Sequence, residues 1–335
     1  MSEILIYLGF AIAAYSVIGN DVIQTLGTFI SSNEKRPWWV LFLFAGSILT
    51  VTLLVGWYMN GGDVSYGRLI GDASQGYSVD NPKYPFIADM SWWYILPPAV
   101  LLIITRLGIP VSTSFMILTF FLPKGLNAMV VKSLMGYGLA FVIGILFYIV
   151  AAKALEGKFR DREMTKVEKT LWSSLQWGST GFLWTLWLVQ DFANIYVYLP
   201  RTLSPLMMFG SLAWLLALLA YIFWSKGGAI QGIVKSKSGT SDIRSATIID
   251  FLYGSMLLFF TFVNTVPMST TWVFIGLLAG REYALRIQLD KKIDASLHKM
   301  VLKDGGKAAI GLVVSILLVF FIKLMEEGNF MVALN

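Results

Sequence analysis

Apolar stretches of roughly membrane thickness recur along this chain, and they limit its fold more than any other feature. Apolar residues make up 56% of the 335 residues and charged residues only 14%, against about 45–50% and about 25% in soluble proteins. Because lipid can cover apolar surface that water cannot, the sequence predicts a polytopic membrane protein. Each stretch should be helical, because a lone strand in lipid leaves its backbone groups unpaired.

Ten apolar stretches follow one another, separated by polar segments of very different length. Their coarse limits are 4–30, 38–58, 91–106, 111–122, 127–152, 171–200, 205–224, 246–264, 267–279 and 307–325. The first is long, about 40 Å for 27 helical residues. A crossing needs about 20 residues, so 111–122 is too short to cross alone. The predicted fold class is all-α, with broken helices.

The basic residues are distributed very unevenly between two alternating sets of loops. Eighteen lie in the loops 31–37, 153–169, 225–245 and 280–305, and four lie in 59–90, 123–126, 201–204 and 326–335. The positive-inside rule places the first set in the cytoplasm. We therefore expect a multi-pass protein of the cell (inner) membrane with both termini extracytoplasmic.

Two pairs of stretches can be read either as re-entrant hairpins or as two full crossings each. These pairs are 91–106 with 111–122, and 246–264 with 267–279. Both readings leave all other loops on the same sides of the membrane, so the distribution of basic residues does not distinguish the two readings. Shortness and a central proline favour re-entrant hairpins. The long polar insert 59–90 is expected to be an extracytoplasmic loop, although loops of this length are sometimes functional lids.

The two halves of the chain carry the same two polar strings in the same order. Gly19–Gln24 corresponds to Val189–Asn194, and Ile109–Ser114 corresponds to Val266–Thr271. By loop parity the first half starts outside and the second inside, so the repeats are inverted, as in many secondary transporters. The predicted organisation is a first repeat over 1–152, a basic cytoplasmic linker over 153–169 and a second repeat over 170–335.

The first string supplies oxygen ligands for a cation. A carboxylate within an apolar segment costs roughly 2.5–3.5 kcal/mol on insertion scales, so two at matching positions indicate a function. Asp21 with Gln24, and Asp191 with Asn194, have i, i+3 spacing and share a helix face. Carboxylate and amide oxygens suit a small hard cation. Protonation is the other way to neutralise the aspartates.

The second string supplies hydrogen-bond donors for an anion. Proline favours the first helical turn, and serine and threonine favour N-caps. A helix that starts at this string would direct N–H groups and hydroxyls to one point near the bilayer centre, which suits a tetrahedral oxyanion. The predicted hydroxyl donors are Ser112, Thr113, Ser114, Ser269, Thr270 and Thr271.

At these residues the sequence resembles the inorganic phosphate transporter (PiT) family of cation-coupled anion symporters. That family duplicates the string G-A-N-D-V-A-N-A-F-G-T and carries P-V-S-T-T-H in each half. The matching positions are Asn20-Asp21-Val22, Gly27-Thr28, Asp191, Ala193-Asn194, Pro110-Val111-Ser112-Thr113, Pro267 and Ser269-Thr270-Thr271. The likeness spans both halves.

The resemblance implies import of inorganic phosphate with Na⁺ or H⁺ by alternating access. Carried over by position, Asp21, Gln24, Asp191 and Asn194 would serve the cation, with Na⁺ at the two aspartates. Asn20 and Gln190 join the six hydroxyl residues at the anion. The chain departs from the family at Gln24 and Gln190, where the family has Asn, and at Phe115 and Trp272, where it has His.

Three functional readings stay open at this stage. Phosphate is favoured over sulfate because protonated phosphate can donate to an aspartate, whereas sulfate cannot. A sulfate permease on the same fold and a non-transporting membrane sensor or scaffold are the alternatives. No Walker A, GxSxG or HExxH string occurs, so we predict no enzyme activity and no cofactor beyond the coupling ion. The expected partners are the anion and the lipid bilayer, with a homodimer left open and no nucleic acid.

Overall fold

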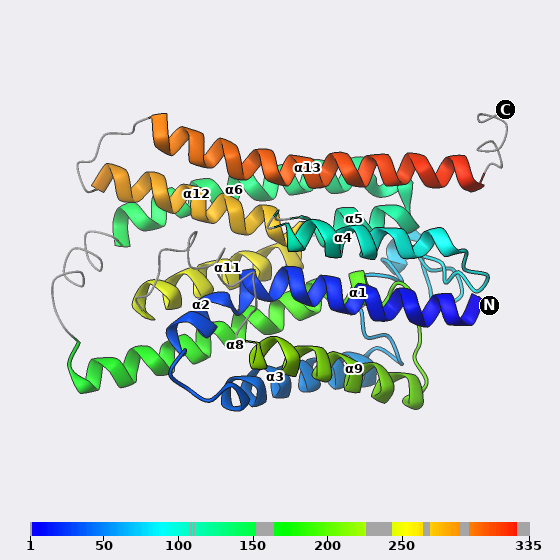
Figure 1. Ribbon diagram of the computed structural model, residues 1–335, viewed down its shortest axis with the longest axis horizontal. Coiled ribbons are helices and arrows are strands. Elements are labelled where there is room, and N and C mark those ends of the chain that lie inside the picture. Colours follow the sequence, from blue (N-terminus) through cyan, green and yellow to red (C-terminus); the bar gives the residue numbers. More distant parts are fainter. Residues whose placement is uncertain are drawn as a thin grey trace.

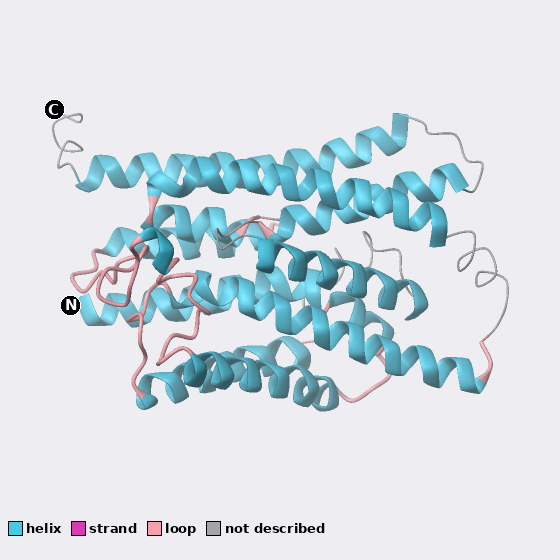
Figure 2. Ribbon diagram, turned by 180° about the vertical axis from the view of Figure 1, so that it is seen from behind, coloured by secondary structure: helices cyan, strands magenta, loops and turns pink. Residues whose placement is uncertain are grey.

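The predicted all-α class is confirmed across the part of the chain that the structure describes. The computed structural model describes residues 2–107, 109, 111–151, 164–225, 243–263, 269–288 and 295–326. Every regular element in these ranges is a helix (Figure 2). Six of the described helices are long and apolar enough to cross a membrane. The chain is therefore a multi-pass membrane protein.

Among the described residues, the first half contains six α-helices and three short 3-10 helices. The α-helices are α1 (Ser2–Thr25), α2 (Gly27–Ser32), α3 (Trp38–Met59), α4 (Leu96–Arg106), α5 (Thr113–Phe121) and α6 (Leu126–Ala151). The 3-10 helices are η1 (Ala73–Gln75), η2 (Trp92–Ile95) and η3 (Pro123–Gly125).

The described helices of the second half follow a corresponding order, and all except α9 are longer than their counterparts. They are α8 (Lys166–Tyr196), α9 (Pro205–Trp224), α11 (Ile243–Val263), α12 (Thr270–Gln288) and α13 (Ala295–Glu326). Thr165 caps α8 in a capping box with Glu168, so this helix begins within the predicted linker 153–169. Residues 152–163 of that linker lie outside the described residues, and the predicted division into repeats stays a prediction.

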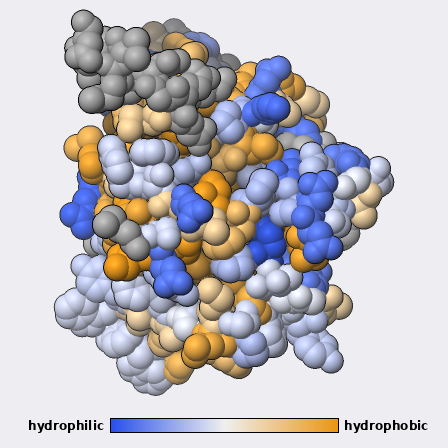
Figure 3. Space-filling view, turned by 90° about the vertical axis from the view of Figure 1, so that its right-hand side faces the viewer, coloured by the Kyte–Doolittle hydropathy of each residue, from blue (hydrophilic) through white to orange (hydrophobic). Residues whose placement is uncertain are grey.

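Corresponding helices run in opposite directions (Figure 1). Helix α1 starts, and α13 ends, at the end of the molecule that carries loop 59–90, which we call the loop end (Figure 1). Hydrophilic side chains are spread over this end (Figure 3). The start of α1 and the end of α13 lie at the same end of the molecule, as the alternation of the loops predicts (Figure 1). Which side of the membrane this end faces stays a prediction.

Two helical hairpins enter the bundle from opposite ends. Helices α4 and α5 have 11 and 9 residues, about 16 Å and about 14 Å, and are too short to cross a core of about 30 Å. They open towards the loop end, whereas α11 and α12 open towards the other end (Figure 1). Helices α5 and α12 begin midway along the molecule (Figure 1), and we call their first residues the hairpin tips. The arms of the second hairpin are longer than predicted, since α12 continues to Gln288 instead of ending at 279.

Each hairpin packs against both halves of the chain. The first arms, α4 and α11, lie against α1 and α8, the first long helices of their own halves. The second arms, α5 and α12, lie against α13 and α6, the last helices of the opposite halves. This exchange of partners joins the two halves around the hairpin tips.

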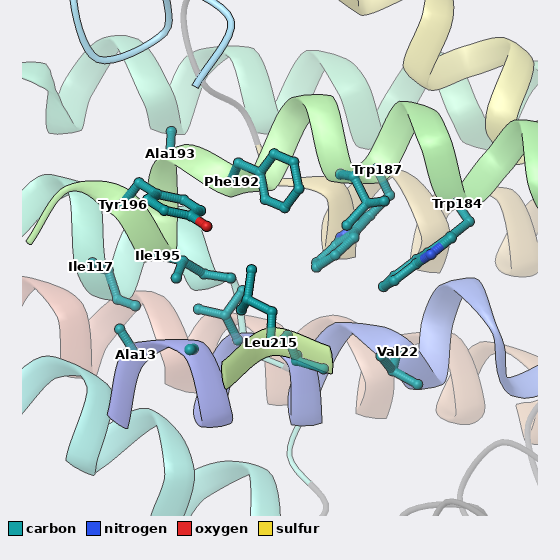
Figure 4. Packing of buried hydrophobic residues seen from close by; sticks show 14 of the residues in the cluster. Ala13, Val22, Ile117, Trp184, Trp187, Phe192, Ala193, Ile195, Tyr196 and Leu215 are labelled. Atoms are coloured by element: carbon teal, nitrogen blue, oxygen red, sulfur yellow. The ribbon is translucent and has the colours of Figure 1, made fainter. Parts of the chain in front are cut away.

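Large aromatic side chains fill the interior beside α8. Trp184 and Trp187 stack with ring centroids 4.9 Å apart (Figure 4), and Phe192 meets Tyr196 edge to face. All four are almost completely buried. Because such rings bury large apolar areas, they fix α8 in the bundle.

Candidate functional site

The two predicted acidic strings lie inside continuous helices, so each i, i+3 pair shares a helix face. Helix α1 runs through Gly19–Gln24 and stops at Thr25, and α8 runs through Val189–Asn194 and stops at Tyr196. The reason is that the amide and carboxylate side chains find partners without any unwinding. Gln24 Nε2 donates to Asp21 Oδ1 at 2.9 Å, and Asn194 Nδ2 donates to Asp191 Oδ1 at 2.5 Å.

The predicted hydroxyl strings stand at the starts of α5 and α12. Ser112 Oγ accepts from Phe115 N, and Ser269 Oγ accepts from Trp272 N, both at 3.2 Å. These are matching N-caps of the second hairpin arms. Pro110 and Pro267, which belong to the same strings, lie outside the described residues.

Thr113 connects the two aspartates. Its Oγ1 lies 3.1 Å from Asp21 Oδ2 and 3.5 Å from Asp191 Oδ1, and it accepts from Asn194 Nδ2 at 3.0 Å. All four side chains are buried. The aspartates of the two halves therefore lie on either side of one hydroxyl group at the tip of the first hairpin.

The tip of the second hairpin reaches the same place. Thr271 Oγ1 donates to the carbonyl of Val111 at 3.1 Å and accepts from Gln24 Nε2 at 3.0 Å. The side chain of Thr270 lies near the Asp191 carboxylate. We call Asp21, Gln24, Thr113, Asp191, Asn194 and Thr271 the central cluster.

The aromatic residues that stand where the family has histidine also meet. Phe115 follows the first hydroxyl string, Trp272 follows the second, and their rings pack edge to face with centroids 5.9 Å apart. Matching positions of the two hairpins are therefore in direct contact. The departures from the family string close the space between the tips with apolar surface.

Not every predicted site residue belongs to the central cluster. Asn20 Nδ2 donates to Asp21 Oδ1 and to the Val111 carbonyl, and Asn20 Oδ1 accepts from Thr105 of α4. Gln190 Nε2 donates instead to the Leu257 carbonyl and to Thr261 of α11. Each of these amides ties a long helix to the first hairpin arm of its own half.

The remaining hydroxyl residues are buried near the hairpin tips. Ser112 and Ser269 use their side chains as caps, and the Thr270 carbonyl accepts from Tyr253 OH at 3.1 Å. Ser114 is buried at the second position of α5. The structure thus places all the predicted hydroxyls at or next to the two helix starts.

Three buried oxygen atoms of the central cluster have no hydrogen-bond donor among the residues that the structure describes. They are Gln24 Oε1, Asp191 Oδ2 and Asn194 Oδ1. The amide nitrogens of Gln24 and Asn194 each donate to two oxygen atoms, so the amide oxygens are the atoms left without a donor. Unpaired buried oxygens are costly, and carboxylate and amide oxygens are ligands for hard cations.

A third buried carboxylate, Asp250 of α11, was missed by the sequence analysis. Its two oxygens accept from Thr28 of α2 at 2.7 Å and from Thr180 of α8 at 2.6 Å. It has no counterpart in the strings of the first half. An acidic residue within the apolar stretch 246–264 was the signal that could have revealed it.

Comparisons with known proteins give a structural relative. No protein-family model matches the sequence, and a search of curated proteins also finds no match. The fold is similar to the solved structure of a sodium-dependent phosphate transporter, with a TM-score of 0.62 and 15% sequence identity. The similarity covers 96% of this chain and 99% of that one. At this identity the likeness shows that the two chains share a fold.

Proposed function

We propose that this chain is a secondary active transporter that imports inorganic phosphate together with Na⁺. The observation that carries the proposal is the central cluster, in which both aspartates and both hairpin tips meet around Thr113. The shared fold with a sodium-dependent phosphate transporter supports it.

The chemistry of the cluster favours Na⁺ over H⁺ as the coupling ion. Asp21 Oδ1 accepts from the amide groups of Asn20 and Gln24, whose N–H groups can only donate, and this suits an ionised carboxylate. The Thr113 hydroxyl beside Asp21 Oδ2 can either donate or accept, so it is compatible with both ions. The three unpaired oxygens of Gln24, Asp191 and Asn194 supply further ligand atoms for a cation.

Anion binding belongs to the starts of α5 and α12 in this proposal. N-terminal N–H groups of helices favour negative charge, and the two starts come from opposite halves. A cation at the aspartates offsets their charge and allows the oxyanion to approach. Because the hairpins open to opposite ends, rocking of one half against the other would expose the cluster alternately.

The test is uptake of radiolabelled phosphate into proteoliposomes under an inward Na⁺ gradient. Asp21→Asn and Asp191→Asn keep the side-chain shape but remove the charge, and each should abolish uptake. The matched control is Asp72→Asn, in the loop before η1, where the carboxylate accepts from the backbone and side chain of Ser74. This variant should transport as the wild type does.

Each other reading gives a different result in the same assay. Uptake by both cluster variants at the wild-type rate would refute the role of the aspartates. Strong competition by sulfate, with little by phosphate, would favour a sulfate permease. Phosphate-dependent stabilisation of the purified protein without any flux would favour a sensor. Uptake driven by a pH gradient in the absence of Na⁺ would make H⁺ the coupling ion.

A further inference from the structure

Part of loop 59–90 is built into the protein rather than lying free at its surface. Asp63 Oδ1 accepts from the backbone N–H and the hydroxyl of Ser65, at 2.7 and 2.6 Å, and Asp63 Oδ2 accepts from Gly67 N at 2.6 Å. The Gly62 carbonyl accepts from Leu203 N at 2.9 Å. These bonds fix the backbone of residues 62–69 against the second half of the chain.

This fixed segment directs one arginine inwards. Arg68 is 6% exposed, and its Nε donates to the carbonyl of Val189 at 3.0 Å. Val189 lies two residues before Asp191 on α8. The loop therefore brings a guanidinium group to the helix that carries the second aspartate.

The Arg68 guanidinium has unused hydrogen-bonding capacity. Among the described residues, its buried Nη1 has no hydrogen-bond partner and no carboxylate forms an ion pair with the group. Burial lowers the pKa of Arg68 to about 10, against the opposing influence of the Asp191 charge, so the group is protonated at neutral pH. An unpaired buried cation is unfavourable unless a ligand or partner compensates it.

A second buried arginine at the loop end, Arg201, shows what a purely structural role would look like. Arg201 is also 6% exposed, and its Nε and Nη1 also lack a hydrogen-bond partner among the described residues, but its Nη2 donates to the carbonyls of Tyr196, Val197 and Leu199. It thereby caps the C-terminus of α8. Arg68 makes one backbone contact at the side of the same helix and caps nothing, so helix capping does not explain it.

We propose that Arg68 is an anion-binding residue of the transport pathway, whose free Nη1–H group donates to the oxyanion on the loop-end side of the central cluster. The inference rests on the proposed function, because it needs an oxyanion in the pathway. A guanidinium is suited to this task because its planar fork can bind two oxygens of a tetrahedral oxyanion.

The test measures phosphate and Na⁺ binding separately on purified protein. Radiolabelled phosphate is titrated at saturating NaCl, and Na⁺ is titrated alone by thermal stabilisation, with choline chloride as reference. Arg68→Gln should raise the Kd for phosphate at least tenfold, and Arg68→Lys should raise it by less, since lysine keeps the charge but loses the fork. Arg201→Lys is the matched control and should leave the phosphate Kd within about twofold.

The response to Na⁺ separates an anion contact from a merely structural role. Removing a positive charge near Asp191 should leave the Na⁺ affinity unchanged or raise it, whereas loss of structure would lower both affinities together. An unchanged phosphate Kd in Arg68→Gln, or a parallel loss of both affinities, would overturn the inference and leave the proposed function intact.

Two remaining outcomes also decide whether Arg68 binds the anion. If Arg68→Gln does not fold, Arg68→Lys decides, and a phosphate Kd equal to that of the wild type would overturn the inference. If the wild-type protein binds neither phosphate nor Na⁺, the proposed function fails, and the role of Arg68 fails with it.

Discussion

The hydroxyl of Thr113 is the group that links the two aspartates, and its loss should affect cation binding. Thr113→Val keeps the shape but removes the donor to Asp21 and the acceptor for Asn194. Unsatisfied buried polar groups cost about 1–3 kcal/mol, so we expect the apparent Na⁺ affinity to fall roughly tenfold or more. Sodium-dependent phosphate uptake over a range of NaCl concentrations measures this change.

Two further threonine variants serve as controls for that experiment. Thr113→Ser retains the hydroxyl and should keep most of the Na⁺ affinity. Thr185→Val lies on α8, where the native hydroxyl only donates to the Gly181 carbonyl of its own helix at 2.9 Å, and should leave the affinity unchanged. An equal loss in Thr113→Val and Thr185→Val would mean that the effect is general and not caused by the cluster.

Among the helices, the contact of α12 with α6 depends on glycines. A Cβ added to Gly276 would lie 2.4 Å from the Tyr137 carbonyl oxygen, and one added to Gly280 would lie 2.2 Å from the Phe141 carbonyl oxygen. The two glycines form a Gly-x-x-x-Gly string, which allows helix backbones to approach closely. This contact positions α12, and therefore also Thr270 and Thr271 at its start.

Enlarging one of these glycines should therefore destabilise the protein. In Gly280→Ala the new methyl group meets a backbone atom that cannot move alone, and overpacking of this kind costs about 1–3 kcal/mol. We expect a lower Tm in detergent. Gly210→Ala in α9, where a Cβ meets nothing within 4 Å, should have an equal or higher Tm than wild type. A Tm of Gly280→Ala at or above that of wild type would contradict the close contact.

On the scale of the whole molecule, the inverted arrangement predicts which loops share a side of the membrane. The chain contains no cysteine, so single cysteines report position without background. Ser74→Cys in loop 59–90 should react with a membrane-impermeant maleimide added outside intact cells. Lys35→Cys between α2 and α3 should react only after permeabilisation. The opposite pattern would reverse the orientation, and labelling of both from outside would contradict the topology.

The sequence by itself determined the features that depend on local periodicity and on duplication. Apolar length gave the helical membrane class, because lipid leaves few ways to pair backbone groups. The i, i+3 spacing placed Asp21 with Gln24 and Asp191 with Asn194, because neighbouring turns of a helix bring such residues together whatever surrounds it. The serine caps of α5 and α12 followed from the same local preferences.

Only the tertiary structure decided which of these residues meet. Thr271 lies 247 positions from Gln24, and Arg68 lies 121 from Val189, and no periodicity relates residues so far apart. The partner exchange of the hairpins brought the tips together, and a fixed loop brought Arg68 inwards. Asp250 found its donors on α2 and α8 in the same way. Contacts of this kind depend on how helices pack, which a local pattern does not encode.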